Sequence, residues 1–264
     1  ENTVFISIHY GNNEAGVLEP LRKIAEVLME ERKRRDKSGN KIPLVFHTDA
    51  VQAFQYFDCD VNRLNLDSLS LSAHKFNGPN GVGLLYLRKG LHFLPQTQGG
   101  SQEEGRRAGT ENLAAIIGLV AAMKIVDQKR TENERKASKL TDYLVERIRE
   151  AVPDSILIGP KDLRKRLPHI ATFLFRGIEG ESILIKLDQV GIAASSGSAC
   201  TSGSLAPSHV TKALGYSDID AHGSVRFSLS PTNTTEEIDY LMKNLPKIIR
   251  DLRKMSPFYK KESS

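Results

Sequence analysis

Apolar residues in the first third of the chain form short strand-like runs with one helical run between them. Residues 4–9 predict a buried strand, and residues 44–47 predict another. Between these strands, apolar residues at helical spacing predict an amphipathic helix over residues 21–35 with a basic outer face. Two more strands are predicted over residues 67–72, where apolar and polar positions alternate, and over residues 81–87. A strand, a helix and a strand at this spacing form a βαβ unit with parallel strands, which predicts an α/β fold.

Helical periodicity in the middle of the chain predicts a long helix over residues 112–152, with a break near residues 128–133. Because such a helix commonly bridges two domains, we predict one domain over residues 1–129 and another over residues 130–264. Strand-like and helical runs alternate downstream, which predicts a small α+β domain. The expected elements are strands over residues 155–158, 169–175, 192–194 and 224–229, a helix over residues 179–190, and a last helix that begins with a capping box of Thr234 and Glu237.

The composition is that of an ordinary globular protein and argues against nucleic-acid-binding and membrane-spanning functions. Of the 264 residues, 39% are hydrophobic and 26% are charged, which suffices for a sizeable core. The net charge of +5 comes from scattered Lys and Arg residues, so we expect no nucleic-acid partner. No apolar run approaches the length of a membrane span, and the N-terminus lacks a signal-peptide pattern. Two cysteines cannot form a disulfide framework, which favours the cytoplasm.

Lys75 lies in the segment Ser72-Ala73-His74-Lys75-Phe76-Asn77-Gly78-Pro79, on a tight connection between two predicted strands. A lone lysine in a turn is usually a surface residue, but polar residues follow other predicted strands as well. The carboxyl ends of strands in an open α/β sheet are where ligands bind, and Asn13, Asp49 and Gln52 fall in such places. Pyridoxal 5'-phosphate needs a lysine for its aldehyde and an acid beside its ring nitrogen, which suits Lys75 and Asp49.

The other polar residues suit the rest of the same cofactor. Gln52 and Asn13 are neutral donors for its phenolic oxygen, and Ser72, His74 and Thr110 suit its phosphate oxygens. Taken singly, Asp49 fits a turn or a helix cap equally well, and Asn13 or Gln52 is more often structural.

Cys200 lies among small residues, in Ser195-Ser196-Gly197-Ser198-Ala199-Cys200-Thr201-Ser202-Gly203. This composition predicts a mobile, exposed loop in which a thiolate can attack sulfur or an electrophile. The same loop also suits an anion nest that binds phosphate through backbone amides. Cys59 has two acidic neighbours that would raise its pKa, and we interpret it as incidental.

Six segments of the chain together resemble one protein family. They are Asn12-Asn13-Glu14-Ala15-Gly16, Asp49-Ala50-Val51-Gln52, Ser72-Ala73-His74-Lys75, Arg106-Arg107-Ala108-Gly109-Thr110, Ser195-Ser196-Gly197-Ser198-Ala199-Cys200-Thr201-Ser202 and Val225-Arg226-Phe227-Ser228-Leu229. In this order and spacing they resemble the group I, NifS/IscS-like cysteine desulfurases of the class V aminotransferase-like enzymes. The resemblance implies a fold-type I, pyridoxal-phosphate-dependent transferase. Residues 1–129 would be the C-terminal portion of a large domain with a mainly parallel sheet, and residues 130–264 the small α+β domain that carries the cysteine loop.

Roles follow from the resemblance residue by residue. Lys75 would be the Schiff-base lysine, Cys200 the persulfide-forming nucleophile, and His74 a further catalytic residue. The implied cofactor-binding residues are Asn13, Asp49, Gln52, Ser72, His74, Lys75 and Thr110. Asn13 and Arg226 would bind the substrate, with Arg226 at its carboxylate, for which a guanidinium fork is suited. No resident metal is implied, although Cys200 is a possible iron–sulfur ligand during transfer.

The implied reaction converts L-cysteine to L-alanine and leaves the sulfur as a persulfide on Cys200 for iron–sulfur cluster or thio-cofactor assembly. The implied partners are a sulfur-acceptor protein, such as an iron–sulfur scaffold, and a second subunit whose cofactor phosphate Thr110 reaches, as in a homodimer. A selenocysteine lyase is a close alternative, because it shares this scaffold.

One departure from the family concerns the beginning of the chain. The family has an additional segment ahead of Asn2, whereas this chain begins without Met and directly in a strand-like run. We therefore expect a chain that lacks the N-terminal part of a family member, including a phosphate-binding turn and a histidine that stacks on the cofactor ring. A third possible function follows, that of a non-catalytic sulfur carrier or scaffold-binding module.

Overall fold

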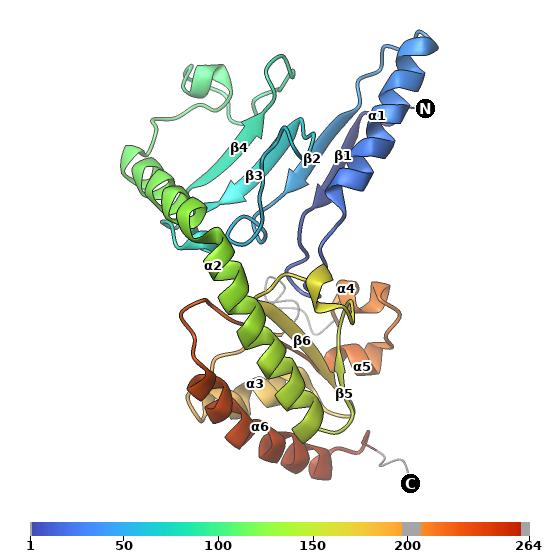
Figure 1. Ribbon diagram of the computed structural model, residues 1–264, viewed down its shortest axis with the longest axis vertical. Coiled ribbons are helices and arrows are strands. Elements are labelled where there is room, and N and C mark those ends of the chain that lie inside the picture. The colour runs from blue at the N-terminus through green and yellow to red at the C-terminus, as the bar shows by residue number, and fades with distance from the viewer. Residues whose placement is uncertain (1, 197–206, 260–264) are drawn as a thin grey trace. The chain divides into compact units, whose positions relative to one another are not determined.

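The computed structural model describes residues 2–196 and 207–259 (Figure 1). The chain divides into two compact units, of which the first comprises Glu1–Gly11 and Glu19–Arg130 and the second Asn12–Leu18 and Thr131–Ser264. The turn over residues 12–18 thus belongs to the second unit, an excursion that the sequence did not indicate. We retain residues 1–129 and residues 130–264 as the two proposed domains.

The first unit contains a four-stranded sheet in the order β1-β2-β3-β4. Its strands are β1 (Phe5–His9), β2 (Val45–Asp49), β3 (Ser68–Ser72) and β4 (Gly83–Leu87). The β1–β2 and β2–β3 pairs are parallel and the β3–β4 pair is antiparallel, which confirms the predicted mainly parallel sheet. Helix α1 (Leu21–Lys37) connects β1 to β2 and completes the predicted βαβ unit.

β1 is only partly buried, on one face, which corrects the prediction of a buried strand. Ile6 and Ile8 pack against the core that α1 and the first part of α2 share with the sheet. Phe5, on the other face of β1, is 54% exposed, and Val4, which precedes the strand, is 49% exposed. Alternation along a strand therefore leaves every second side chain on the open face.

Helix α2 (Leu113–Ala151) runs without interruption, so the predicted break near residues 128–133 is wrong. That stretch contains no Gly or Pro that would interrupt the backbone hydrogen bonds. Charged pairs at helical spacing also support it, namely Arg130–Asp127 at 3.3 Å and Lys136–Glu132 at 2.7 Å.

The second unit contains a three-stranded antiparallel sheet that helices cover on one face. The strands are β5 (Ser155–Leu157), β6 (Ile170–Phe175) and β7 (Ser224–Ser228), in the order β5-β6-β7. The second half of α2, α3 (Gly180–Asp188) and α6 (Thr235–Met255) share a core with β6 and β7. This arrangement confirms the predicted α+β architecture, and the capping box at Thr234 and Glu237 is present.

Several short elements differ from the predictions. Residues 192–194 do not form a strand; an isolated bridge between Ser195 and Arg226 takes its place. Two short helices, α4 (His209–Ala213) and α5 (Asp218–His222), were not predicted because five residues carry too little periodicity. The 3₁₀ segments are η1 (Ala73–Phe76), η2 (Glu103–Gly105) and η3 (Leu163–Lys165). None of the helices in the described part of the chain is long and apolar enough to span a membrane.

Asp67 fixes the start of β3 through a charge cluster. Its Oδ2 accepts the backbone N–H of Phe46 at 2.8 Å and also bonds Arg32, and its Oδ1 lies 3.1 Å from Nε of Arg88. Because this carboxylate is largely buried, Asp67→Asn is expected to lower the free energy of unfolding of the first unit by about 2–3 kcal/mol. Hydrogen exchange of the β2 and β3 amides measures the change.

The matched control is Asp58→Asn, because Asp58 forms an ion pair with Arg63 at 2.6 Å but is well exposed. That change is expected to cost less than about 1 kcal/mol. Equal losses in the two variants would contradict the assigned role of Asp67.

Candidate active site

Lys75 lies in η1, directly after β3 and before β4, as the sequence predicted. Asn77 ends the 3₁₀ turn with φ of 65°, and Gly78 follows where a Cβ would come 2.8 Å from that of Ala73. The turn is therefore tight, and the Lys75 side chain is exposed. Among the described residues, its ammonium group has no hydrogen-bond or ion-pair partner, which leaves the amine available for chemistry.

Asp49 ends β2, the strand next to β3, and pairs in register with Ser70. Its carboxylate is exposed, and Oδ1 accepts the N–H of Val51 at 2.9 Å, which fixes its orientation. Gln52 follows in the same turn and is partly buried. Because β2 and β3 are parallel, Asp49 and Lys75 lie at the same edge of the sheet.

Ser72 and His74 lie beside each other at the start of η1. The Ser72 Oγ and His74 Nδ1 atoms are 2.8 Å apart. This bond presents a hydroxyl and an imidazole at the edge that also carries Lys75, and both groups can bind anionic oxygens.

Thr110 lies at the end of a polar loop in the first unit. Within the loop, the Ala108 N–H donates to the Thr97 carbonyl at 3.2 Å, and the Gly109 N–H donates to the side chain of Gln102 at 3.1 Å. Thr110 itself is exposed, three residues before α2 begins.

Asn13 and Arg226 lie together in the second unit. Arg226 Nη1 donates to the Asn13 carbonyl at 2.9 Å. The Asn13 side chain is exposed on the turn, and Arg226 is partly buried in β7. This bond to the backbone carbonyl places Asn13 next to Arg226, whose guanidinium is suited to bind a carboxylate.

Cys200 lies outside the described residues, whereas Cys59 is described and lies among core side chains of the first unit. Burial raises the pKa of the Cys59 thiol to about 12. Since the thiolate is the reactive form, Cys59 is inert near neutral pH. This result supports the interpretation of Cys59 as incidental. No group of three or more metal-ligating side chains occurs within residues 2–196 and 207–259.

His47 is a candidate active-site residue that the sequence analysis did not identify. It lies two residues before Asp49 on the same face of β2, with Ser7 Oγ 2.7 Å from its Nδ1 and the Phe5 ring stacked at 5.8 Å. Burial lowers the pKa of His47, and the Asp49 carboxylate acts in the opposite direction. The alternation of residues 45–49 was the signal that could have placed both side chains on one face.

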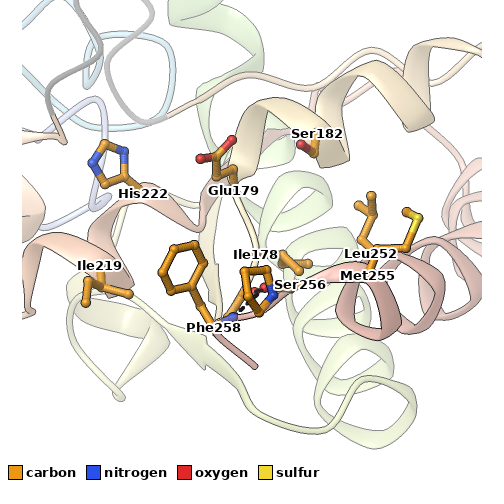
Figure 2. Close-up of a pocket in the computed structure, with 11 residues that line it drawn as sticks. Ile178, Glu179, Ser182, Ile219, His222, Leu252, Met255, Ser256 and Phe258 are labelled. Carbon is orange, nitrogen blue, oxygen red and sulfur yellow. Dashed lines mark hydrogen bonds between the residues drawn. The ribbon is translucent and has the colours of Figure 1, made fainter. Parts of the chain in front are cut away.

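A pocket of about 390 Å³ lies elsewhere in the second unit (Figure 2). Apolar side chains of Ile219, Leu252, Met255 and Phe258 line it, together with Glu179 and His222. None of the predicted site residues lines this pocket, so we do not assign the chemistry to it.

The chain is similar to known proteins over nearly its whole length. Residues 1–241 match the family model "Aminotransferase class-V". The chain is 45% identical over 259 residues to the cysteine desulfurase IscS of Clostridium botulinum, covering 98% of this chain and 62% of that protein. The chain therefore spans about three fifths of the length of the curated relatives that it matches.

Solved structures show the same similarity. A NifS-like protein superimposes with a TM-score of 0.83 at 32% identity, over 96% of this chain and 62% of that one. A second structure, "SspA in complex with cysteine", has a TM-score of 0.66 at 31% identity, over 88% of this chain and 60% of that one.

Proposed function

This chain belongs to the class V aminotransferase family, and from that membership we propose that the protein is a pyridoxal-phosphate-dependent cysteine desulfurase. One observation carries the proposal: Lys75, whose amine has no partner among the described residues, shares a sheet edge with the Asp49 carboxylate, in a chain 45% identical to a cysteine desulfurase. The similar structure in complex with cysteine supports the choice of L-cysteine as substrate.

The residues present fit pyridoxal 5'-phosphate. Lys75 would hold the aldehyde carbon, and Asp49 would pair with the ring nitrogen. Gln52 and Asn13 would contact the phenolic oxygen. The phosphate would be bound by Ser72 and His74, which already form a hydrogen-bonded pair, and by Thr110 from the other subunit of a dimer. When bound, the cofactor supplies an electron sink for the bonds of the substrate's α-carbon.

The chain's own residues account for the remaining tasks. Asn13 and Arg226 bind and orient the substrate carboxylate, which leaves the substrate sulfur free for attack. Lys75 and His74 are the groups that take up and deliver protons at the sheet edge. The carbon–sulfur bond breaks, the Cys200 thiolate takes the sulfur to form a persulfide, and a proton replaces sulfur on the carbon that becomes the alanine methyl group.

An acceptor protein, such as an iron–sulfur scaffold, would then receive the sulfur from Cys200. The two cysteines favour the cytoplasm as the compartment. The test of the function is alanine formation by the complete protein with pyridoxal 5'-phosphate and L-cysteine. Alanine production with a cysteine rate above the selenocysteine rate supports a desulfurase. No cofactor binding and no alanine would leave only the non-catalytic module.

An exposed apolar surface on the first unit supports a proposed homodimer. The early part of α2 exposes Leu113, Ile117 and Val120, which are 67%, 69% and 42% accessible and share one helix face. This apolar stripe begins three residues after Thr110, the residue proposed to reach the other subunit.

Ile117→Glu is therefore expected to weaken dimerisation by about 2 kcal/mol or more, because it would bury a charge in the interface. Sedimentation velocity of the complete protein measures the shift toward monomer. The control is Ile185→Glu, an apolar position on α3 that is 59% exposed and is not in the stripe. A dimer that persists in Ile117→Glu would exclude the stripe from the interface.

A further inference from the structure

A buried carboxylate holds the turn over residues 12–18 in the second unit. Glu14 is only 8% exposed, and its Oε2 accepts the hydroxyl hydrogen of Ser208. Its backbone carbonyl accepts the hydroxyl of Thr172 on β6. The turn is closed internally by Asn12 Oδ1, which accepts the N–H groups of Glu14 at 2.9 Å and Ala15 at 2.7 Å.

Backbone bonds and apolar packing fix the same turn. The Leu167 N–H donates to the Gly16 carbonyl at 2.7 Å, and the Leu18 N–H donates to the Lys165 carbonyl at 3.1 Å. Ala15 packs with Leu174 of β6 in a small cluster, on the face of the sheet opposite α2, α3 and α6. The conformation at Asn13 is therefore determined by the second unit.

Ser208 uses its whole hydrogen-bonding capacity in this arrangement. Its hydroxyl donates to Glu14 and accepts the N–H groups of Val210 at 3.2 Å and Thr211 at 3.3 Å, which makes it the N-cap of α4. Because Ser208 is 5% exposed, no water can replace the carboxylate as its acceptor without rearrangement.

Arg226 makes an equivalent connection on the other side of the turn. Its guanidinium donates to the Asn13 carbonyl, and its backbone exchanges two hydrogen bonds with Ser195, at 3.1 and 2.6 Å. Ser195 precedes Cys200 in the chain and Ser208 follows it. Arg226 thus bonds both Asn13 and Ser195, which lies before the cysteine segment. Ser208, which lies after that segment, bonds Glu14.

We propose that Glu14 is a positioning residue: by its hydrogen bond to Ser208 it holds Asn13 beside Arg226 and connects this carboxylate-binding pair to the chain after Cys200. Together, Glu14, Ser208, Asn13, Arg226 and Ser195 form one hydrogen-bonded frame in the second unit. The substrate part of this inference rests on the proposed function, whereas the frame itself does not.

The test compares Glu14→Ala, Ser208→Ala and the double variant in the complete protein with its cofactor. Hydrogen exchange of the peptide over residues 12–18 is expected to accelerate about tenfold in each single variant, because a buried partner is left unpaired. The double variant should exchange no faster than the faster single variant, since both changes remove one bond. In an active enzyme, the KM for cysteine should rise about tenfold with little change in kcat, as for lost uniform binding.

The matched control is Ser217→Ala. Ser217 caps the five-residue helix α5 as Ser208 caps α4, but among the described residues its hydroxyl bonds only within its own turn. It should leave both readouts unchanged. Exchange over residues 12–18 that is unaltered in Glu14→Ala, or single effects that simply add, would overturn the frame. An inactive wild-type protein would defeat the proposed function alone, because the exchange readout needs no turnover.

Discussion

Lys75→Ala is expected to abolish the borohydride-stable bond between the protein and pyridoxal 5'-phosphate and to reduce alanine formation about a thousandfold or more. The physical reason is the position of Lys75 on η1, where its exposed side chain lies at the same sheet edge as Asp49. No other group in that turn offers a nucleophilic amine. The measurement is mass spectrometry of the reduced protein, together with an alanine assay.

The matched control is Lys89→Ala, because Lys89 is an exposed lysine that follows β4 in the same unit. That variant should keep both the trapped cofactor and the activity. A cofactor that still attaches covalently to Lys75→Ala would show that another lysine does this chemistry.

Cys200→Ser is expected to leave the cofactor bound at Lys75 but to lower alanine formation at least about a thousandfold. The carbon–sulfur bond can break productively only when a thiolate accepts the sulfur, and a hydroxyl is a poor substitute. Cys59→Ala is the control, since burial raises the pKa of Cys59 to about 12 and its thiol should not react. Full activity in Cys200→Ser would refute its role as sulfur acceptor.

The arrangement around Lys75 could be predicted because it depends on local patterns and one topological rule. Alternation and periodicity define β2, α1 and β3, and parallel strands bring their carboxyl ends to one edge of a sheet. Asp49 and Lys75 therefore share an edge in the structure, as the sequence indicated.

Features that depend on distant partners could not be predicted in the same way. The exposed face of β1 depends on which elements pack over the sheet, and that packing is not encoded in the strand's own pattern. The turn that carries Asn13 belongs to the second unit because of bonds to Thr172, Ser208 and Arg226, which lie more than 150 residues away. Helix α2 shows the opposite error, since a break was predicted near residues 128–133, where no residue disrupts the backbone.

The most direct test of the proposed desulfurase is to locate the sulfur on the protein after reaction. The complete protein with bound cofactor is incubated with L-cysteine, digested without reductant and analysed by mass spectrometry. We expect one additional sulfur atom on the peptide that contains Cys200, none on the peptide that contains Cys59, and loss of the adduct after a thiol is added. Alanine formation with no sulfur on Cys200, or with the sulfur on Cys59, would contradict the account.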